Sequence, residues 1–219
     1  MSGELVFVGL GLHDENDLSL RGLKTIKKAD KIFAELYTSP MPAFSISKLE
    51  KLCKKKISMV SRYDLEEEAG QKILDAAKKG KTVLLVPGDP LIATTHVDLR
   101  IRAEKQRIKT RIIHGASIIS AVIGLSGLQN YKYGRSVTIP FTNEISTVET
   151  PYKVIMENKR LGLHTLCFLD IKAEEKRYMT IRHGLKALLA MEKIKRKRVV
   201  APDTLAVGVA RAGSNNPTV

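Results

Sequence analysis

The sequence contains few aromatic residues and almost no cysteine. It has no tryptophan, its aromatic residues make up only 5% of the chain, and its two cysteines, Cys53 and Cys167, lie far apart. Two thiols without the close spacing of metal ligands do not form a zinc motif, so we predict no metal site. Such sparse cysteine is typical of proteins in reducing compartments and favours a cytoplasmic location.

Long apolar runs are also absent. No stretch approaches the roughly 20 apolar residues that a bilayer-spanning helix requires. The first residues lack the basic and apolar regions of a signal peptide. We therefore predict no membrane association. The length of 219 residues, with 43% hydrophobic and 27% charged residues, fits a globular protein of one large or two small domains.

Negative charge is scarce as well. The chain has 37 Lys and Arg against 23 Asp and Glu, which gives a formal net charge of +14 and suggests an acidic partner or a polyanion. Much of the excess lies in three runs, at 54–56, 78–81 and 193–198. We interpret these runs as solvated helix ends. No aromatic residue is interleaved with them to stack on bases, so we do not expect nucleic acid as a ligand.

Strand and helix patterns alternate along the chain. Short apolar runs such as Val83–Val86 predict buried strands, and residues repeating at helical spacing lie between them. The predicted strands are 4–10, 31–36, 57–60, 83–86, 110–113, 136–139, 165–169 and 204–210. The predicted helices are 19–29, 45–53, 65–79, 96–105, 117–123, 151–160 and 180–191. This alternation predicts an α/β fold, a parallel sheet with helices on both faces. A glycine-rich stretch at 124–134 predicts a boundary between domains at 1–130 and 135–219.

Three loops share one form, in which an apolar strand ends in small or acidic residues. They are Gly9-Leu10-Gly11-Leu12, Pro87-Gly88-Asp89-Pro90 and Leu169-Asp170-Ile171-Lys172. Ligands of open α/β sheets bind at the carboxyl ends of strands, although ordinary strand-to-helix turns explain such loops equally well. The first loop lacks the third glycine of a dinucleotide fingerprint, which argues against a nicotinamide site.

These loops, together with Ala93-Thr94-Thr95-His96, resemble the tetrapyrrole methylase superfamily, whose members use S-adenosylmethionine. Further segments resemble one family within it, the diphthine synthases. They are Ala116-Ser117-Ile118, Gly162-Leu163-His164-Thr165-Leu166, Leu169-Asp170-Ile171-Lys172 and Ala210-Arg211-Ala212-Gly213. The segments occur in the family's order and cover nearly the whole chain.

The resemblance implies two α/β domains with S-adenosylmethionine in the cleft between them, in a cytoplasmic homodimer. It implies a methyltransferase of diphthamide biosynthesis. The substrate would be a histidine of translation elongation factor 2 that carries a 3-amino-3-carboxypropyl group, whose amino nitrogen is methylated to give diphthine. The positions that match the family's methyl-donor contacts are Leu12, Asp89, Ile92, Ser117, Ile118, Leu169 and Ala212.

The chemistry of these residue types suits such a donor. The carboxylate of Asp89 can pair with the donor's ammonium group or accept a hydrogen bond from its ribose, and Ser117 offers a hydroxyl at a helix start. The aliphatic positions can form the apolar walls of a cofactor pocket. For these aliphatic residues, ordinary core packing is the competing interpretation.

The attacking amine must lose its proton before methyl transfer, because an unperturbed amine is mostly protonated at neutral pH. We assign no catalytic base from the sequence. His96 and His114 lie near the predicted donor loops, but we interpret them as structural residues at a helix start and a strand end. Glu35 and Tyr37, which follow the second strand, are the alternatives that could face the substrate.

Two features depart from the family's pattern. The chain ends at Val219, before a histidine-bearing segment that closes the donor pocket in the family, so we expect a shortened C-terminal domain. The loop at 141–150 does not resemble the family's loop there. Two other functions therefore remain open. One is a related methyltransferase that acts on a porphyrin ring or an RNA ribose, and the other is a catalytically inactive basic module that binds RNA.

Overall fold

The chain forms two compact units in the computed structural model, which describes residues 3–141, 148–173 and 175–219. Unit 1 comprises residues 1–121 and 211–216, and unit 2 comprises residues 122–210 and 217–219. The division falls inside one helix. The domain limits of 1–130 and 135–219 stay a prediction, because compactness alone does not show that a segment folds independently.

A parallel sheet forms the centre of unit 1. Within the described residues it has five strands in the order β3-β2-β4-β1-β5. Their bounds are β1 (Glu4–Gly9), β2 (Lys31–Ala34), β3 (Ser58–Met59), β4 (Lys81–Val86) and β5 (Lys109–Ile113). All of these strands lie within or overlap predicted strands. β4 is the central strand and β1 is its neighbour, and both are almost entirely buried because both of their faces are covered.

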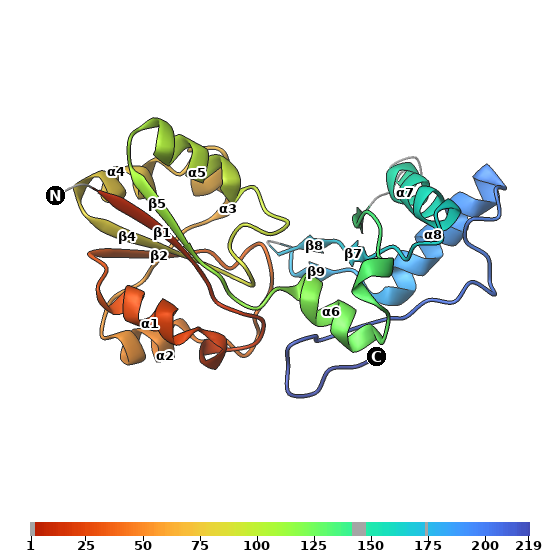
Figure 1. Cartoon of the computed structure of the whole chain (residues 1–219), viewed down its shortest axis with the longest axis horizontal. Coiled ribbons are helices and arrows are strands. Elements are labelled where there is room, and N and C mark those ends of the chain that lie inside the picture. The colour runs from red at the N-terminus through yellow and green to blue at the C-terminus, as the bar shows by residue number, and fades with distance from the viewer. Residues whose placement is uncertain (1–2, 142–147, 174) are drawn as a thin grey trace. The chain divides into compact units, whose positions relative to one another are not determined.

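Helices cover both faces of this sheet, which confirms the predicted α/β fold. Figure 1 shows α1 and α2 on one face and α4 and α5 on the other. The helices of unit 1 and its boundary are α1 (Leu20–Lys27), α2 (Ile46–Cys53), α3 (Arg62–Glu66), α4 (Gln71–Lys79), α5 (His96–Lys105) and α6 (Ile118–Ser126), with a short 3-10 helix η1 (Glu15–Asp17) before α1.

The core of unit 1 lies in two layers, one on each face of the sheet. Val6 of β1 points toward α1 and α2, where it joins a cluster with Ile26 and Leu49. The alternating neighbour Phe7 points the other way, into a cluster with Ile73. Burying one such side chain contributes about 1.5–3 kcal/mol, so both layers stabilise the sheet substantially.

Serine side chains cap two of these helices. Ser19 accepts a hydrogen bond from the backbone N–H of Gly22 at 3.0 Å, and Ser45 caps α2 through the N–H of Lys48 at 3.4 Å. Each cap satisfies one of the four N–H groups that a helix start leaves without a partner. The positions of α1 and α2 are therefore encoded locally.

The predicted helix at 65–79 is wrong as a single element. The structure has α3 and α4 there, separated by a break at Ala69 and Gly70, whose φ angles are +54° and +66°. These left-handed angles end a right-handed helix. Leu65 and Ile73 both pack into the same core cluster, although they belong to different helices. Their apolar spacing therefore resembles that of one continuous helix.

The predicted strand at 204–210 is also wrong. Apart from an isolated bridge between Ala210 and Thr218, this segment has no strand structure. Its apolar residues do not face a core, since Leu205 is 99% exposed and Val207 is 49% exposed. A strand requires a hydrogen-bonding neighbour, and the described residues provide none for 204–209.

Unit 2 is a smaller α/β unit. Its elements are η2 (Asn130–Lys132), β6 (Val137–Ile139), α7 (Glu149–Arg160), β7 (Cys167–Leu169), β8 (Ile171–Lys172), β9 (Arg177–Tyr178) and α8 (Ile181–Lys195). β6 pairs with β7 in parallel, and β8 pairs with β9 antiparallel. Ile139, Tyr152 and Met191 belong to its buried core. The predicted loop at 141–150 lies largely outside the described residues.

The carboxylate of Glu192 organises the end of α8. It accepts hydrogen bonds from the N–H groups of Arg198, Val199 and Val200 at 2.7–3.0 Å and from the hydroxyl of Tyr152 at 2.8 Å. Burial raises the pKa of Glu192, but these hydrogen bonds outweigh it and bring the pKa to about 2.

Three loops of unit 1 meet through glycines at the carboxyl ends of β1, β4 and β5. A Cβ on Gly9 would lie 2.4 Å from the carbonyl oxygen of Gly88, and a Cβ on Gly115 would lie 2.5 Å from the same oxygen. These distances leave no room for a side chain. The three strand ends can approach one another this closely only with glycine at these positions.

Among the described residues, no helix combines the length and the apolar character that crossing a membrane demands.

We expect Gly115→Ala to lower the free energy of unfolding by about 1–3 kcal/mol, because its Cβ would displace backbone rather than a flexible side chain. Chemical denaturation followed by circular dichroism measures this. Gly124→Ala is the control, since the described structure has no atom within 4 Å of its Cβ and alanine favours the helix. Equal stability of Gly115→Ala and the wild type would contradict the close approach.

We expect Glu192→Gln to lower the free energy of unfolding by about 2 kcal/mol near neutral pH, because the amide loses charge-assisted hydrogen bonds. The folded pKa of about 2 lies below the ordinary value of 4.5. The stabilisation is therefore complete above pH 4.5 and is lost as pH falls toward 2.

Denaturation of wild type and variant across this pH range tests the prediction, and the difference between them should shrink as pH falls. Glu157→Gln, on the exposed side of α7, is the matched control. A difference that stays constant with pH would show that the charge of Glu192 is not responsible.

Candidate functional site

The candidate site is the carboxyl edge of the sheet in unit 1, formed by the loops 10–12, 87–90 and 114–117. The first two loops are joined by paired backbone hydrogen bonds: the N–H of Gly88 donates to the carbonyl of Gly11 at 2.7 Å, and the reverse bond is 3.4 Å long. Gly11 and Gly88 both have positive φ angles, of +80° and +68°. The predicted strand-end loops after β1 and β4 are thus held side by side.

Asp89 projects from this edge and pairs with His114. Its Oδ2 lies 2.7 Å from Nδ1 of His114, which follows β5. The Asp89 side chain is only 9% exposed, whereas that of His114 is 76% exposed. The other oxygen, Oδ1 of Asp89, is buried and has no hydrogen-bond partner among the described residues. A buried acceptor without a partner points to a ligand that supplies the donor.

Three further predicted positions lie in or just after the loops of this edge. Ile92 is 47% exposed, and its N–H donates to the carbonyl of Asp89 at 3.3 Å. Ser117 caps α6, where its Oγ accepts a hydrogen bond from the N–H of Ile119 at 3.3 Å. Ile118, the first residue of α6, is 37% exposed. Ile92 and Ile118 are therefore partly exposed apolar residues at the carboxyl edge of the sheet and do not belong to the buried core.

Leu12 and Ala212 come together from opposite ends of the chain. Residues 211–216 return to unit 1, and a Cβ placed on Gly213 would lie 2.3 Å from the Cβ of Leu12. Leu12 itself is held by its N–H, which donates to Asp17 at 2.9 Å. The neighbour of Gly213, Ala212, is therefore close to the first strand-end loop.

Leu169 belongs to unit 2, where it ends β7 and packs against Gly184 of α8. The next residue, Asp170, is engaged within its own unit: its oxygens accept hydrogen bonds from the N–H groups of Phe141 and Ile171 at 2.7 and 2.8 Å. Six of the seven predicted donor contacts thus lie in unit 1. Their role in donor binding, and that of Leu169, stays a prediction.

A buried Glu35–His96 pair lies at the neighbouring strand end. Glu35 is completely buried, and its Oε1 is 3.2 Å from Nε2 of His96, a nitrogen that has no hydrogen-bond partner among the described residues. Its oxygens also accept hydrogen bonds from the N–H groups of Tyr37 and Thr38 and from the hydroxyl of Thr38. Glu35 therefore binds its own loop rather than facing solvent.

His96 connects this carboxylate to the segment that precedes α5. Its Nδ1 bonds the hydroxyl of Thr94, and Ala93 takes a left-handed φ of +55°. Thr95 stands directly before α5, but its hydroxyl makes no capping bond and donates to Glu66 at 3.5 Å. The motif 93–96 thus fixes the chain beside Asp89 through a buried polar contact.

Tyr37 lies next to this pair. Burial raises the pKa of the Tyr37 hydroxyl strongly, and the negative charges of Glu35 and Glu66 raise it further. The guanidinium of Arg62 lies over its ring at 5.3 Å, and the ring is 6.4 Å from that of His96. Tyr37 is therefore protonated at physiological pH and is not itself a base.

Two contacts of the site were not predicted from the sequence. The bond between Asp89 and His114 joins residues 25 positions apart. Each lies in a loop that follows an apolar run, but the two strands, β4 and β5, are separated in the sheet by β1. The sequence indicates the buried pair of Glu35 and His96 only weakly. Its one indication is that the carboxylate of Glu35 stands at the end of an apolar strand. In both cases the sequence pattern does not indicate which partner each side chain contacts.

The described residues contain no group of three or more His, Cys, Asp or Glu side chains that could hold a metal ion. Two cavities of unit 1 lie away from the carboxyl edge, one of about 910 Å³ beside α4 and one of about 300 Å³ beneath α1. The edge itself combines a carboxylate oxygen in need of a donor with glycine backbone that permits close approach. These features fit a ligand with cationic or hydroxyl groups, as S-adenosylmethionine has.

Known proteins resemble this chain along nearly its whole length. Residues 4–219 match the family model described as Tetrapyrrole (Corrin/Porphyrin) Methylases. A diphthine synthase of Methanocella arvoryzae is 48% identical over 98% of this chain and 83% of its own length. A diphthine synthase of Methanocaldococcus jannaschii is 49% identical over 97% of this chain and 83% of its own length.

A crystal structure of a diphthine synthase is similar to this one with a TM-score of 0.85 at 43% identity, covering 98% of this chain and 79% of that one. The match extends across both units, and the predicted family resemblance is confirmed. The chain belongs to the tetrapyrrole methylases and, within them, to the diphthine synthases, the methyltransferases of diphthamide biosynthesis.

Proposed function

We propose that this chain transfers methyl groups from S-adenosylmethionine to the amino nitrogen of the 3-amino-3-carboxypropyl-histidine of translation elongation factor 2, forming diphthine. The observation that carries the proposal is the unpartnered Oδ1 of Asp89 at a glycine-lined strand edge, in a chain that is 48% identical to a diphthine synthase. The enzyme is proposed to act in the cytoplasm as a homodimer.

The donor is held, in this proposal, by Leu12, Asp89, Ile92, Ser117, Ile118, Leu169 and Ala212. Asp89 accepts a hydrogen bond through Oδ1 from either the ammonium group or the ribose of the donor. The partly exposed Ile92 and Ile118 supply apolar contacts. His114 keeps the Asp89 carboxylate oriented through its bond to Oδ2.

Methyl transfer is an in-line displacement, so the protein contributes mainly by positioning the two reactants. When bound, S-adenosylmethionine supplies the electrophilic methyl group. The attacking amine must be neutral, and a group at the site must accept its proton. We propose His114 for this role, because its Nδ1 is engaged by Asp89 while 76% of its side chain is exposed and leaves Nε2 accessible.

The charge of the chain suits a protein substrate with an acidic surface. A net charge of +14 favours the encounter with such a surface and should make the reaction sensitive to ionic strength. The same charge would suit RNA, so methylation of an RNA ribose is the competing function. The two substrates are distinguished directly by following the methyl label.

We expect Asp89→Ala to weaken S-adenosylmethionine binding at least about tenfold, the effect of losing a charge-assisted hydrogen bond of roughly 1.5 kcal/mol. Isothermal titration calorimetry measures the affinity, and circular dichroism checks the fold. Asp98→Ala is the matched control, because Asp98 is exposed on α5 and pairs only with Arg102 among the described residues. Normal donor binding by Asp89→Ala would remove this loop from the site.

We expect the wild-type protein, incubated with S-adenosylmethionine and the unmethylated elongation factor 2 intermediate, to add whole methyl units to the modified histidine. Mass spectrometry of the peptide that contains this histidine detects the increments. Total RNA with isotopically labelled donor serves as the parallel reaction. Label in RNA and none in the factor would refute the proposed function in favour of the RNA alternative.

A further inference from the structure

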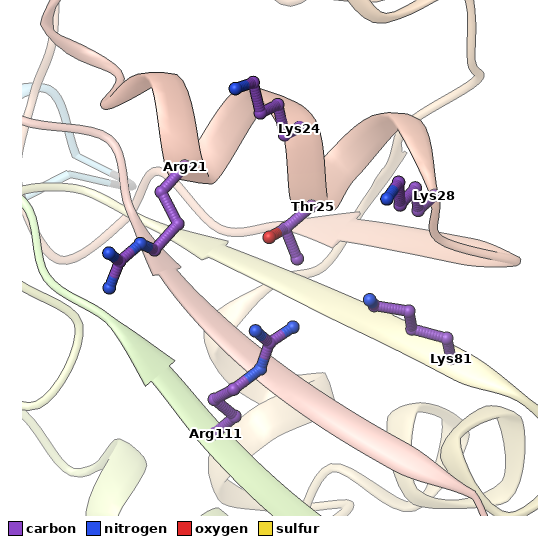
Figure 2. A pocket seen from close by; sticks show the side chains of 6 residues that line it. All are labelled: Arg21, Lys24, Thr25, Lys28, Lys81 and Arg111. Atoms are coloured by element: carbon purple, nitrogen blue, oxygen red, sulfur yellow. The ribbon is translucent and has the colours of Figure 1, made fainter.

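The basic pocket, the cavity of about 300 Å³ beneath α1, is lined by Arg21, Lys24, Thr25, Lys28, Lys81 and Arg111. Figure 2 shows that the first four of these residues lie on α1 or directly after it, whereas Lys81 lies on β4 and Arg111 on β5. Five of the six are cations, and they come from three elements that are distant in sequence. The fold, rather than a local run of lysines, assembles this charge.

The sheet register explains why these residues meet. Arg111 of β5 lies beside Val6 of β1, and Lys81 of β4 lies beside Glu4. Glu4 and Val6 are two positions apart in one strand, so all four side chains point to the same face. That face carries α1, because Val6 packs against Ile26. β5 is an edge strand, and Arg111 remains 42% exposed beside α1.

The positive charge of the pocket is poorly compensated. Glu4 bridges Arg111 at 3.3 Å and Lys81 at 3.7 Å. Arg21, Lys24 and Lys28 have no ion pair among the described residues and are exposed. Arg21 and Lys24 lie on α1 and Lys28 is its C-cap residue. Their spacing of three and four residues brings like charges close together, and these charges repel one another. A bound anion would relieve this repulsion.

The lining also restricts what kind of anion fits. It contains no aromatic or large aliphatic side chain, so it offers no surface for stacking a base or packing a hydrocarbon. Two guanidinium groups offer forked donors that match phosphate oxygens, and lysines supply point charges beside them. The ligand chemistry is therefore that of linked phosphate groups, which concentrate several negative charges in a small volume.

The pocket is separate from the candidate methyl-donor site. Lys81 begins β4 and Val86 ends it, which places the two ends about 16 Å apart at roughly 3.3 Å per residue. Asp89 follows the far end. We propose that the basic pocket is a second ligand site, which binds the phosphate groups of a polyphosphate or of an RNA backbone.

The test uses the full chain and two charge-matched triple variants. Arg21→Gln/Lys24→Gln/Lys28→Gln removes the three unpaired cations of the pocket. Lys27→Gln/Lys51→Gln/Lys105→Gln removes three exposed cations that do not line it, from α1, α2 and α5. Both lower the net charge by the same amount, so general electrostatic attraction falls equally. Thermal unfolding checks that both variants fold.

Calorimetric titration with sodium tripolyphosphate should show binding that the pocket variant weakens by about tenfold or more and the control variant by less than about threefold. A short single-stranded RNA forms the second arm. If the pocket variant loses RNA binding but not tripolyphosphate binding, and the control variant loses neither, the proposal is supported. The phosphate groups then come from nucleic acid. Loss of tripolyphosphate binding identifies a small ligand.

Three results would overturn the proposal. These are the absence of binding in both arms, equal weakening by both triple variants, and equal competition by poly-glutamate at matched charge. The last would indicate a surface for acidic protein. The affinity for S-adenosylmethionine should be the same in the wild type and in both triple variants. This test is therefore independent of the proposed methyl transfer.

Discussion

The close approach of three glycines at the carboxyl edge is the constraint on which the candidate site depends. Gly9, Gly88 and Gly115 each end or follow a different strand, and a Cβ on Gly9 or Gly115 would collide with the carbonyl of Gly88. Their contact sets the spacing of the three loops. Asp89 and His114 are 25 residues apart, yet they meet at 2.7 Å because the backbones beneath them touch.

Buried polar contacts hold the rest of the edge. Glu35 has no exposed surface, and its hydrogen bonds with its own loop and its proximity to His96 join the end of β2 to the start of α5. A buried carboxylate is costly unless it is well partnered, so removing either member would leave an uncompensated polar group. The pair therefore stabilises the segment beside Asp89, which includes the left-handed residue Ala93.

Much of unit 1 could be predicted because its signals are local. Apolar runs located the strands, and residues repeating at helical spacing located most of the helices. The errors occurred where tertiary context decides. Leu65 and Ile73 share one side of the core across a broken helix, and an apolar segment at 204–210 has no neighbouring strand. The site residues came from resemblance, and neither the Glu35–His96 contact nor the Asp89–His114 bond could be read from spacing.

The two ends of the parallel sheet carry opposite charge, and this separation has a physical reason. The proposed donor carries two positive groups, a sulfonium and an ammonium, against one carboxylate, so a chain of net charge +14 repels it on balance. A local carboxylate offsets this repulsion, and we propose that Asp89 supplies it at the carboxyl ends of the strands. Lys81 and Arg111 stand toward the amino ends, and with the α1 cations they outnumber the single carboxylate Glu4. Screening over about 8 Å at physiological salt is shorter than the strand between them, so each end can attract its own ligand.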